Sequence, residues 1–138
     1  MNKRPRILVV DDDHDALDYL EILLYKKYEI VTALNGFEAL SKVKEELPSL
    51  VVTDIMMPVM DGVRLLNSLR RDASTKEIPV VAITSFIGQY PEKSLAGLGF
   101  DGVITKPPDN AAVCAMIARL LPPDEQARKQ AKNGRRSS

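Results

Sequence analysis

At residues 50–58 the chain reads Leu50-Val51-Val52-Thr53-Asp54-Ile55-Met56-Met57-Pro58. An apolar run of this kind is typical of a strand buried on both faces, and Pro58 can continue neither a strand ladder nor an ordinary helix. Asp54 is therefore predicted at the point where a buried strand meets solvent. Ligands of open α/β sheets bind outside the carboxyl ends of the strands, so Asp54 is a candidate functional residue. The competing interpretation is an Asp that only closes a turn.

The composition bounds the class of protein. A chain of 138 residues, 45% hydrophobic and 28% charged, fits one soluble globular domain. It contains no apolar run of about 18 residues, and its N-terminus leads into a short strand rather than a signal-peptide core, so we expect a cytoplasmic protein without membrane contact. The single cysteine, Cys114, excludes an internal disulfide, and its apolar neighbours predict a buried packing role.

The charges are unevenly distributed along a chain whose net charge is zero. Residues 124–138 carry five basic and two acidic side chains, and the remainder carries a net charge of −3. We expect residues 1–123 to form one domain and residues 124–138 to be a basic, disordered tail, because polar composition with Gly134 and two terminal serines is typical of a solvated end. Binding of the tail to nucleic acid is the less favoured alternative.

The hydrophobic pattern predicts five strands that alternate with five helices. The predicted strands are residues 7–10, 29–33, 50–53, 80–84 and 102–105. The first helix is expected over residues 15–27, opened by Asp13 or His14, and the fourth is expected to begin at Pro91. In the second helix, one apolar face is predicted, made of Phe37, Leu40, Val43 and Leu47.

This alternation favours a parallel sheet covered by helices on both faces. The first, third and fourth strands are continuously apolar, whereas residues 29–33 alternate between polar and apolar, which is typical of a sheet edge. We therefore predict a single doubly wound, flavodoxin-like (βα)5 domain with strand order 2-1-3-4-5. In that order the ligand site lies at the switch between strands 1 and 3.

Five polar groups are predicted to converge at this switch point. Asp11, Asp12 and Asp54 follow strands 1 and 3, and Thr84 and Lys106 follow strands 4 and 5. Two carboxylates about 4 Å apart repel by roughly 4 kcal/mol at an effective dielectric of about 20, and one lysine cannot balance three acids. Carboxylates together with a backbone carbonyl and waters form Mg²⁺ sites, so the charge imbalance predicts Mg²⁺ as the cofactor.

This set of groups fits phosphoryl transfer to a carboxylate. An aspartate beside Mg²⁺ can attack phosphorus and form an aspartyl phosphate, while a lysine and a hydroxyl stabilise the charge on the phosphoryl oxygens. The purely structural alternative is that Lys106 neutralises the acids and that Thr84 makes a local hydrogen bond. Five groups at four strand ends favour the chemical interpretation.

Four segments carry a resemblance to a known family. They are residues 7–13 (ILVVDDD), 53–62 (TDIMMPVMDG), 83–85 (ITS) and 105–107 (TKP), and together they resemble the signature of the response regulator receiver domain of two-component signalling. The resemblance spans about residues 5–121. It implies the CheY-like version of the predicted fold.

The resemblance also implies a role for each matching residue. Asp54 would be the phosphoacceptor, and Asp11 and Asp12 would be the metal-binding acids, with Asp12 the direct ligand. The backbone carbonyl of Met56 and the carboxylate of Asp54 would complete the protein ligands.

Two further roles follow from the same resemblance. Thr84 would be the switch hydroxyl, and Lys106 would contact the phosphoryl group and precede a cis peptide bond to Pro107. Two positions depart from the family pattern. Val103 stands where an aromatic switch residue is usual, and Pro108 replaces the usual Phe after Lys-Pro.

The function that this resemblance implies is a stand-alone receiver. It would accept a phosphoryl group from a sensor histidine kinase or phosphotransfer protein and change its affinity for a downstream protein effector. Such a domain catalyses only its own phosphorylation and dephosphorylation, so we expect no enzyme in the usual sense. Receivers also pair through the face of the fourth helix, fifth strand and fifth helix, which leaves homodimerisation open.

Two alternatives belong to other classes of protein. A phosphatase of the haloacid dehalogenase type would need a second aspartate two residues after the nucleophile, where Met56 stands. The other alternative is a receiver-like interaction module that acts without phosphorylation. The intact acids and lysine argue against that module, while Val103 keeps it open.

Overall fold

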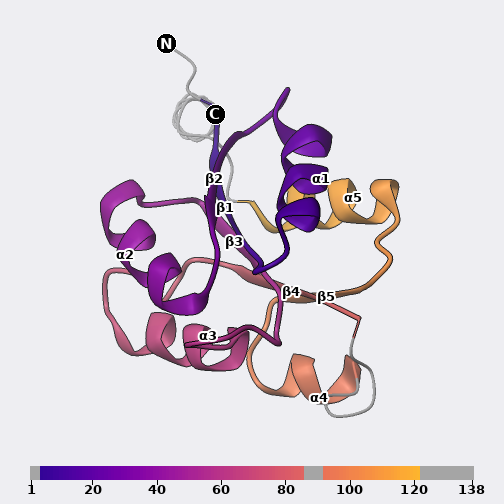
Figure 1. Cartoon of the computed structure of the whole chain (residues 1–138). Helices are drawn as coiled ribbons and strands as arrows, with labels where there is room; N and C mark the ends of the chain where they lie inside the picture. Colours follow the sequence, from indigo (N-terminus) through magenta and orange to yellow (C-terminus); the bar gives the residue numbers. More distant parts are fainter. Residues whose placement is uncertain (1–3, 86–91, 122–138) are drawn as a thin grey trace, which may run out of the picture.

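Five parallel strands form one sheet in the order β2-β1-β3-β4-β5 (Figure 1). The computed structural model describes residues 4–85 and 92–121. The strands are β1 (Arg6–Val10), β2 (Glu29–Ala33), β3 (Leu50–Thr53), β4 (Val80–Thr84) and β5 (Gly102–Thr105). The helices are α1 (His14–Leu24), α2 (Gly36–Glu46), α3 (Gly62–Arg71), α4 (Glu92–Gly97) and α5 (Asn110–Leu120). The predicted doubly wound fold and its strand order are confirmed.

The sheet divides the apolar interior into two clusters because successive side chains of a strand point to opposite faces. In β3, Val51 packs in one cluster, whereas Leu50 and Val52 pack in the other. The first cluster, which we call the α2–α3 cluster, is completed by residues of α2, α3 and α4. The second, the α1–α5 cluster, is completed by residues of α1 and α5. Helices therefore cover both faces, as Figure 1 shows.

Short polar side chains set the start of four helices. Asp13, Asn35, Asp61 and Asp109 are the N-caps of α1, α2, α3 and α5, and each side chain accepts a hydrogen bond from a backbone amide of the first turn. Such caps satisfy amides that have no partner within the helix. The prediction that Asp13 opens the first helix is confirmed. Because three of these helices follow β1, β3 and β5, the caps also fix the loops at the carboxyl edge of the sheet.

Two helical details differ from the prediction. The first helix ends at Leu24 instead of residue 27, because the amides of Lys27 and Tyr28 both turn back to the Leu24 carbonyl. In α2 the predicted apolar face is wrong at both ends. Phe37 is 62% exposed and Leu47 is 66% exposed, and the buried face consists of Gly36, Ala39 and Val43.

Several remaining expectations concern the ends and the single thiol. Cys114 is partly buried and packs against the α1–α5 cluster, so its packing role stands although its burial is incomplete. Within the described ranges, every helix is too short or too polar to cross a bilayer. The predicted start of the fourth helix at Pro91 and the predicted tail at residues 124–138 lie outside the described residues.

Candidate functional site

Three carboxylates meet at the carboxyl edge of the sheet, where β1 and β3 end. Asp11 and Asp12 directly follow β1, and Asp54 directly follows β3, its neighbour in the sheet. One carboxylate oxygen of each residue lies within 4.8 Å of the others. The amide of Asp54 donates to the carbonyl of Val10 and so continues the ladder that aligns the two strand ends. The parallel pairing of β1 with β3 therefore brings the three predicted acids together.

Lys106 is the cation that faces this cluster. Its Nζ lies 2.8 Å from Asp11 Oδ2 and 3.4 Å from Asp54 Oδ2. The Asp11 side chain is only 4% exposed and that of Asp54 is 13% exposed, so both interactions are well shielded from water. Lys106 reaches the cluster from the end of β5, where its amide donates to the carbonyl of Thr84. The acids and the lysine thus converge as the sequence predicts.

The pKa values of this group show that its charges are unbalanced. Burial is the largest cause that raises the pKa of Asp54 above its ordinary value of 3.8, and Asp11 adds to it, while Lys106 acts in the opposite direction without cancelling them. Burial alone would lower the pKa of Lys106, but its hydrogen bond to Asp11 and the two negative charges outweigh burial and raise it. A site in which ionising a carboxyl is costly favours an added cation.

The raised pKa of Asp54 predicts a gain in stability for Asp54→Asn at neutral pH. A carboxyl that binds its proton more tightly in the folded state than in the unfolded state lowers stability as the pH rises from about its ordinary pKa. In EDTA we therefore expect Asp54→Asn to melt at a higher temperature than the parent at pH 7.5, with a smaller difference at pH 4. Thermal melts at the two pH values test this. Asp18→Asn, on an exposed face of α1, serves as the control, and an equal gain at both pH values would contradict it.

Backbone contacts that the sequence analysis missed hold Asp54 in place. The amide of Ile55 donates to Asp54 Oδ1 at 2.7 Å, and the buried Thr53 hydroxyl donates to the Asp54 carbonyl at 2.8 Å. Gly62 lies so close that a Cβ there would stand 2.3 Å from the Asp54 carbonyl oxygen. The sequence holds a signal for this contact, since Asp61-Gly62 follows Asp54 at a short distance, but the path of the loop decides it. Asp54 is therefore a constrained group rather than a mobile side chain.

The loop between β3 and α3 is fixed at both ends. The amide of Gly36 donates to the carbonyl of Met60, and the amide of Gly62 donates to the carbonyl of Ile55. Between these contacts Val59 adopts a φ of 69°, a conformation that costs a β-branched residue on the order of 1–3 kcal/mol. This strain persists because the flanking contacts leave the loop little freedom. The loop is thus a rigid wall of the site.

The other predicted residues lie at the same edge of the sheet. Thr84 ends β4 and is 3% exposed, and Met56 lies in the loop after Asp54 with a half-exposed side chain. The peptide bond between Lys106 and Pro107 is cis, as the resemblance implies. Val103 is partly buried against the α2–α3 cluster, so the position of the usual aromatic switch residue is filled by an aliphatic side chain.

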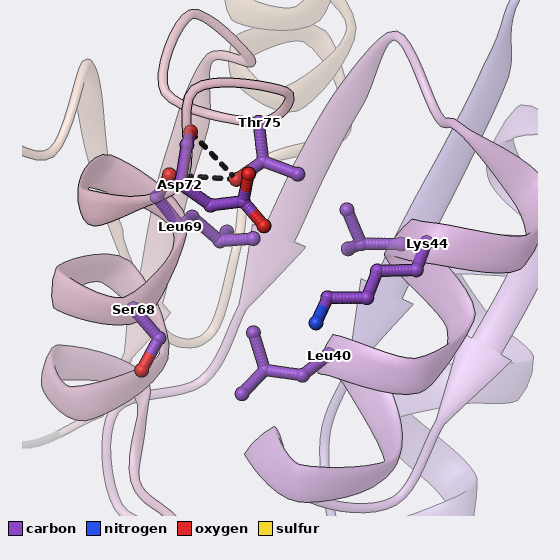
Figure 2. Close-up of a pocket in the computed structure, with 7 residues that line it drawn as sticks. Leu40, Lys44, Ser68, Leu69, Asp72 and Thr75 are labelled. Carbon is purple, nitrogen blue, oxygen red and sulfur yellow. Dashed lines mark hydrogen bonds between the residues drawn. The ribbon is translucent and has the colours of Figure 1, made fainter.

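A smaller hollow of about 100 Å³ lies between α2 and α3 (Figure 2). Its lining includes Leu40 and Leu69, and Lys44 reaches over it from α2. The Thr75 hydroxyl donates to the carbonyls of Leu69 and Asp72, which closes one side. None of the predicted site residues lines this hollow. It is therefore separate from the acidic site.

The fold and the site together define a class of protein. An open parallel sheet with an acidic, oxygen-rich cluster at the switch between β1 and β3, faced by one lysine, is typical of α/β domains that handle a metal and a phosphate group at their carboxyl edge.

Within this class, the chain belongs to the response regulator receiver domain family, whose model matches residues 7–118. Receivers of this family are signalling domains of two-component systems rather than classical enzymes.

Individual relatives agree with this assignment. A 14.6 kDa protein encoded in the sodA1 3′ region of Leptolyngbya boryana is 37% identical over 86% of this chain and 93% of its own length. The response regulator PleD of Caulobacter vibrioides is 37% identical over 95% of this chain, which spans only 30% of PleD. Chemotaxis response regulator CheY4 of Vibrio cholerae superposes with a TM-score of 0.78 at 25% identity, over 86% of this chain and 100% of that structure.

Proposed function

We propose that the protein is a receiver that accepts a phosphoryl group on Asp54 from a histidine kinase or phosphotransfer protein. The observation that carries the proposal is the convergence of Asp11, Asp12 and Asp54 on one shielded site that Lys106 faces. Membership of the receiver family supports the same chemistry. The haloacid dehalogenase alternative gains no support, because the position two residues after Asp54 holds an apolar methionine.

The proposed step is an in-line displacement at phosphorus. The bond between the donor histidine nitrogen and phosphorus breaks, and a bond between an Asp54 carboxylate oxygen and phosphorus forms. The backbone amide of Ile55 already binds Oδ1, whereas Oδ2 faces Lys106. We assign Oδ2 as the attacking oxygen for this reason. The ammonium of Lys106 and the hydroxyl of Thr84 then stabilise charge on the transferred oxygens.

The donor set fits Mg²⁺. Asp11, Asp12 and Asp54 offer hard carboxylate oxygens within 4.8 Å of one another, which is the ligand chemistry that Mg²⁺ prefers. We propose that these three side chains and the carbonyl of Met56 hold the ion, with Asp12 as a direct ligand. When bound, Mg²⁺ would offset the negative charge of the acids and of the incoming phosphoryl group.

The intact mass of the protein after incubation with acetyl phosphate tests the proposal. We expect one added phosphoryl group with Mg²⁺, none with EDTA and none in Asp54→Asn, because labelling requires both the metal and this carboxylate. Asp61→Asn is the matched control, since Asn caps a helix as well as Asp does. It should be labelled like the parent protein.

Failure of labelling with a phosphorylated histidine donor as well would overturn the proposal. The protein would then be a receiver-like module that binds its partner without phosphorylation. If labelling succeeds, we propose that the phosphorylated form binds a downstream protein effector with changed affinity. Pull-down of the labelled and unlabelled forms from the same extract, compared by mass spectrometry, would identify that effector.

A further inference from the structure

A cavity of about 480 Å³ lies beside the acidic site, between α1 and the segment that joins β5 to α5. Pockets that hold small organic molecules have volumes of about 300–1,000 Å³, so this cavity is large enough for a ligand. The hollow between α2 and α3 in Figure 2 holds about 100 Å³ and falls below that range. The cavity beside α1 is therefore the better candidate for a ligand site.

The walls of this cavity are mostly apolar. Ala16 and Leu20 line it from α1, Ile83 lines it from β4, and Pro107 and Pro108 line it from the segment after β5. These side chains offer contact area for a hydrocarbon body without hydrogen-bonding demands of their own.

Tyr19 also lines the cavity and connects its two sides. The Tyr19 hydroxyl donates a hydrogen bond to Asn110 Oδ1, the side chain of the first residue of α5. This bond joins α1 to α5 across the cavity wall. A cavity whose opposite sides are joined in this way is preformed, which lowers the cost of binding.

The rim of the cavity carries excess negative charge. Asp11, Asp13 and Asp15 line it, and Lys106 is the one cation among the lining residues. Lys106 is already paired with Asp11 at 2.8 Å. The carboxylate of Asp13 accepts a hydrogen bond from the amide of Asp15, and within the described residues neither of these two acids forms an ion pair. An apolar cavity with two unpaired carboxylates at its rim is complementary to an organic cation.

We propose that this cavity binds an organic monocation with an apolar body, such as an alkyl or arylalkyl ammonium or guanidinium. The hydrocarbon would lie against Leu20, Ile83 and Pro107, and the charged group would lie at Asp13 and Asp15. The same chemistry is present in a free amine and in a lysine or arginine side chain of another protein. The proposal concerns the unphosphorylated protein and does not depend on phosphoryl transfer.

Three probes with the same body test the proposal by NMR titration in EDTA. They are 4-phenylbutylammonium, 4-phenylbutanol and 4-phenylbutyrate, which differ only in the charge of the head group. We expect shifts of the backbone amides of Ala16, Leu20 and Ile83, with the cation bound more tightly than the alcohol and the alcohol more tightly than the anion. Added salt should weaken the binding of the cation and leave that of the alcohol nearly unchanged.

Matched variants locate the charge effect. Asp13→Asn keeps the helix cap, and it and Asp15→Asn should each weaken binding of the ammonium by about two- to fivefold, as expected for exposed charge pairs. Asp18→Asn removes the same charge from an exposed position of α1 that does not line the cavity. This variant should change the affinity less than either of the other two.

The results separate the possible outcomes. Shifts that are absent from the cavity, or equal affinities for the three head groups, would overturn the proposal, and so would equal losses in the Asp18 and Asp15 variants. Titration with acetyl-Phe-Lys-amide distinguishes the source of the cation. Binding of this peptide would indicate a side chain of a partner protein, whereas binding of the free amine alone would indicate a small molecule.

Discussion

Lys106→Met is expected to change metal binding and phosphorylation in opposite directions. Loss of the ammonium leaves Asp11 and Asp54 without the cation that lies 2.8 Å and 3.4 Å away. A hydrogen bond to a charged group is worth about 1.5–3 kcal/mol, so the affinity for Mg²⁺ should rise about tenfold when the competing cation is removed. The rate of labelling by acetyl phosphate should fall about a hundredfold, as expected when one group that stabilises the transferred oxygens is lost.

Calorimetric titration with Mg²⁺ and labelling followed by intact mass measure the two effects on one preparation. Lys42→Met is the matched control, because Lys42 forms only a surface pair with Glu38 at 3.9 Å. Without metal, Lys106→Met should also melt at a lower temperature, since Asp11 is then a buried charge without a partner, and Mg²⁺ should restore the melting temperature. Weaker binding of Mg²⁺ in the variant would show that the lysine holds the acids in place for the metal instead of competing with it.

Gly62→Ala is expected to destabilise the protein by about 3 kcal/mol, at the upper end of the usual cost of overpacking. The added methyl group would stand 2.3 Å from the carbonyl oxygen of Asp54 and 3.1 Å from the Cα of Ile55. Both atoms belong to the backbone, so no side chain can rotate away to relieve the contact. The measurement is the free energy of unfolding in urea.

Gly97→Ala is the matched comparison within the same protein. Gly97 is the last residue of α4, and a Cβ there meets nothing within 4 Å. Since Ala is the better helix former, we expect this variant to be more stable by about 0.5 kcal/mol. Equal effects at the two glycines would contradict the close approach of Gly62 to Asp54. Opposite signs would confirm that the crowding, and not the loss of glycine, determines the cost.

The sequence predicts the strand order and the convergence of the acids because both depend on local pattern and parallel topology. Asp11, Asp54 and Lys106 each follow a strand, and the carboxyl ends of parallel strands lie at one edge of the sheet. No knowledge of packing is needed for that inference. The roles of these residues in phosphorylation stay predictions that the experiments above address.

The inward face of α2 could not be predicted in the same way. Hydrophobicity ranks Phe37 and Leu47 above glycine and alanine, yet Gly36 and Ala39 are the buried residues. At Gly36 a Cβ would stand 2.7 Å from the carbonyl oxygen of Met60, so only a small residue allows the helix to approach the loop after β3. Close approaches of this kind depend on where a distant segment runs. The same reason explains why the contact between Gly62 and Asp54 was missed.

The division of the interior into two clusters has a consequence for how this domain can change in evolution. Leu20 and Ile83 belong to the α1–α5 cluster, whereas Leu66 belongs to the α2–α3 cluster on the opposite face of the sheet. Substitutions that share no contact are nearly additive in free energy, so a change near Leu20 and a change near Leu66 should show little epistasis. The surface of α1 can therefore diverge toward new ligands and partners while the α2–α3 half keeps its own sequence constraints.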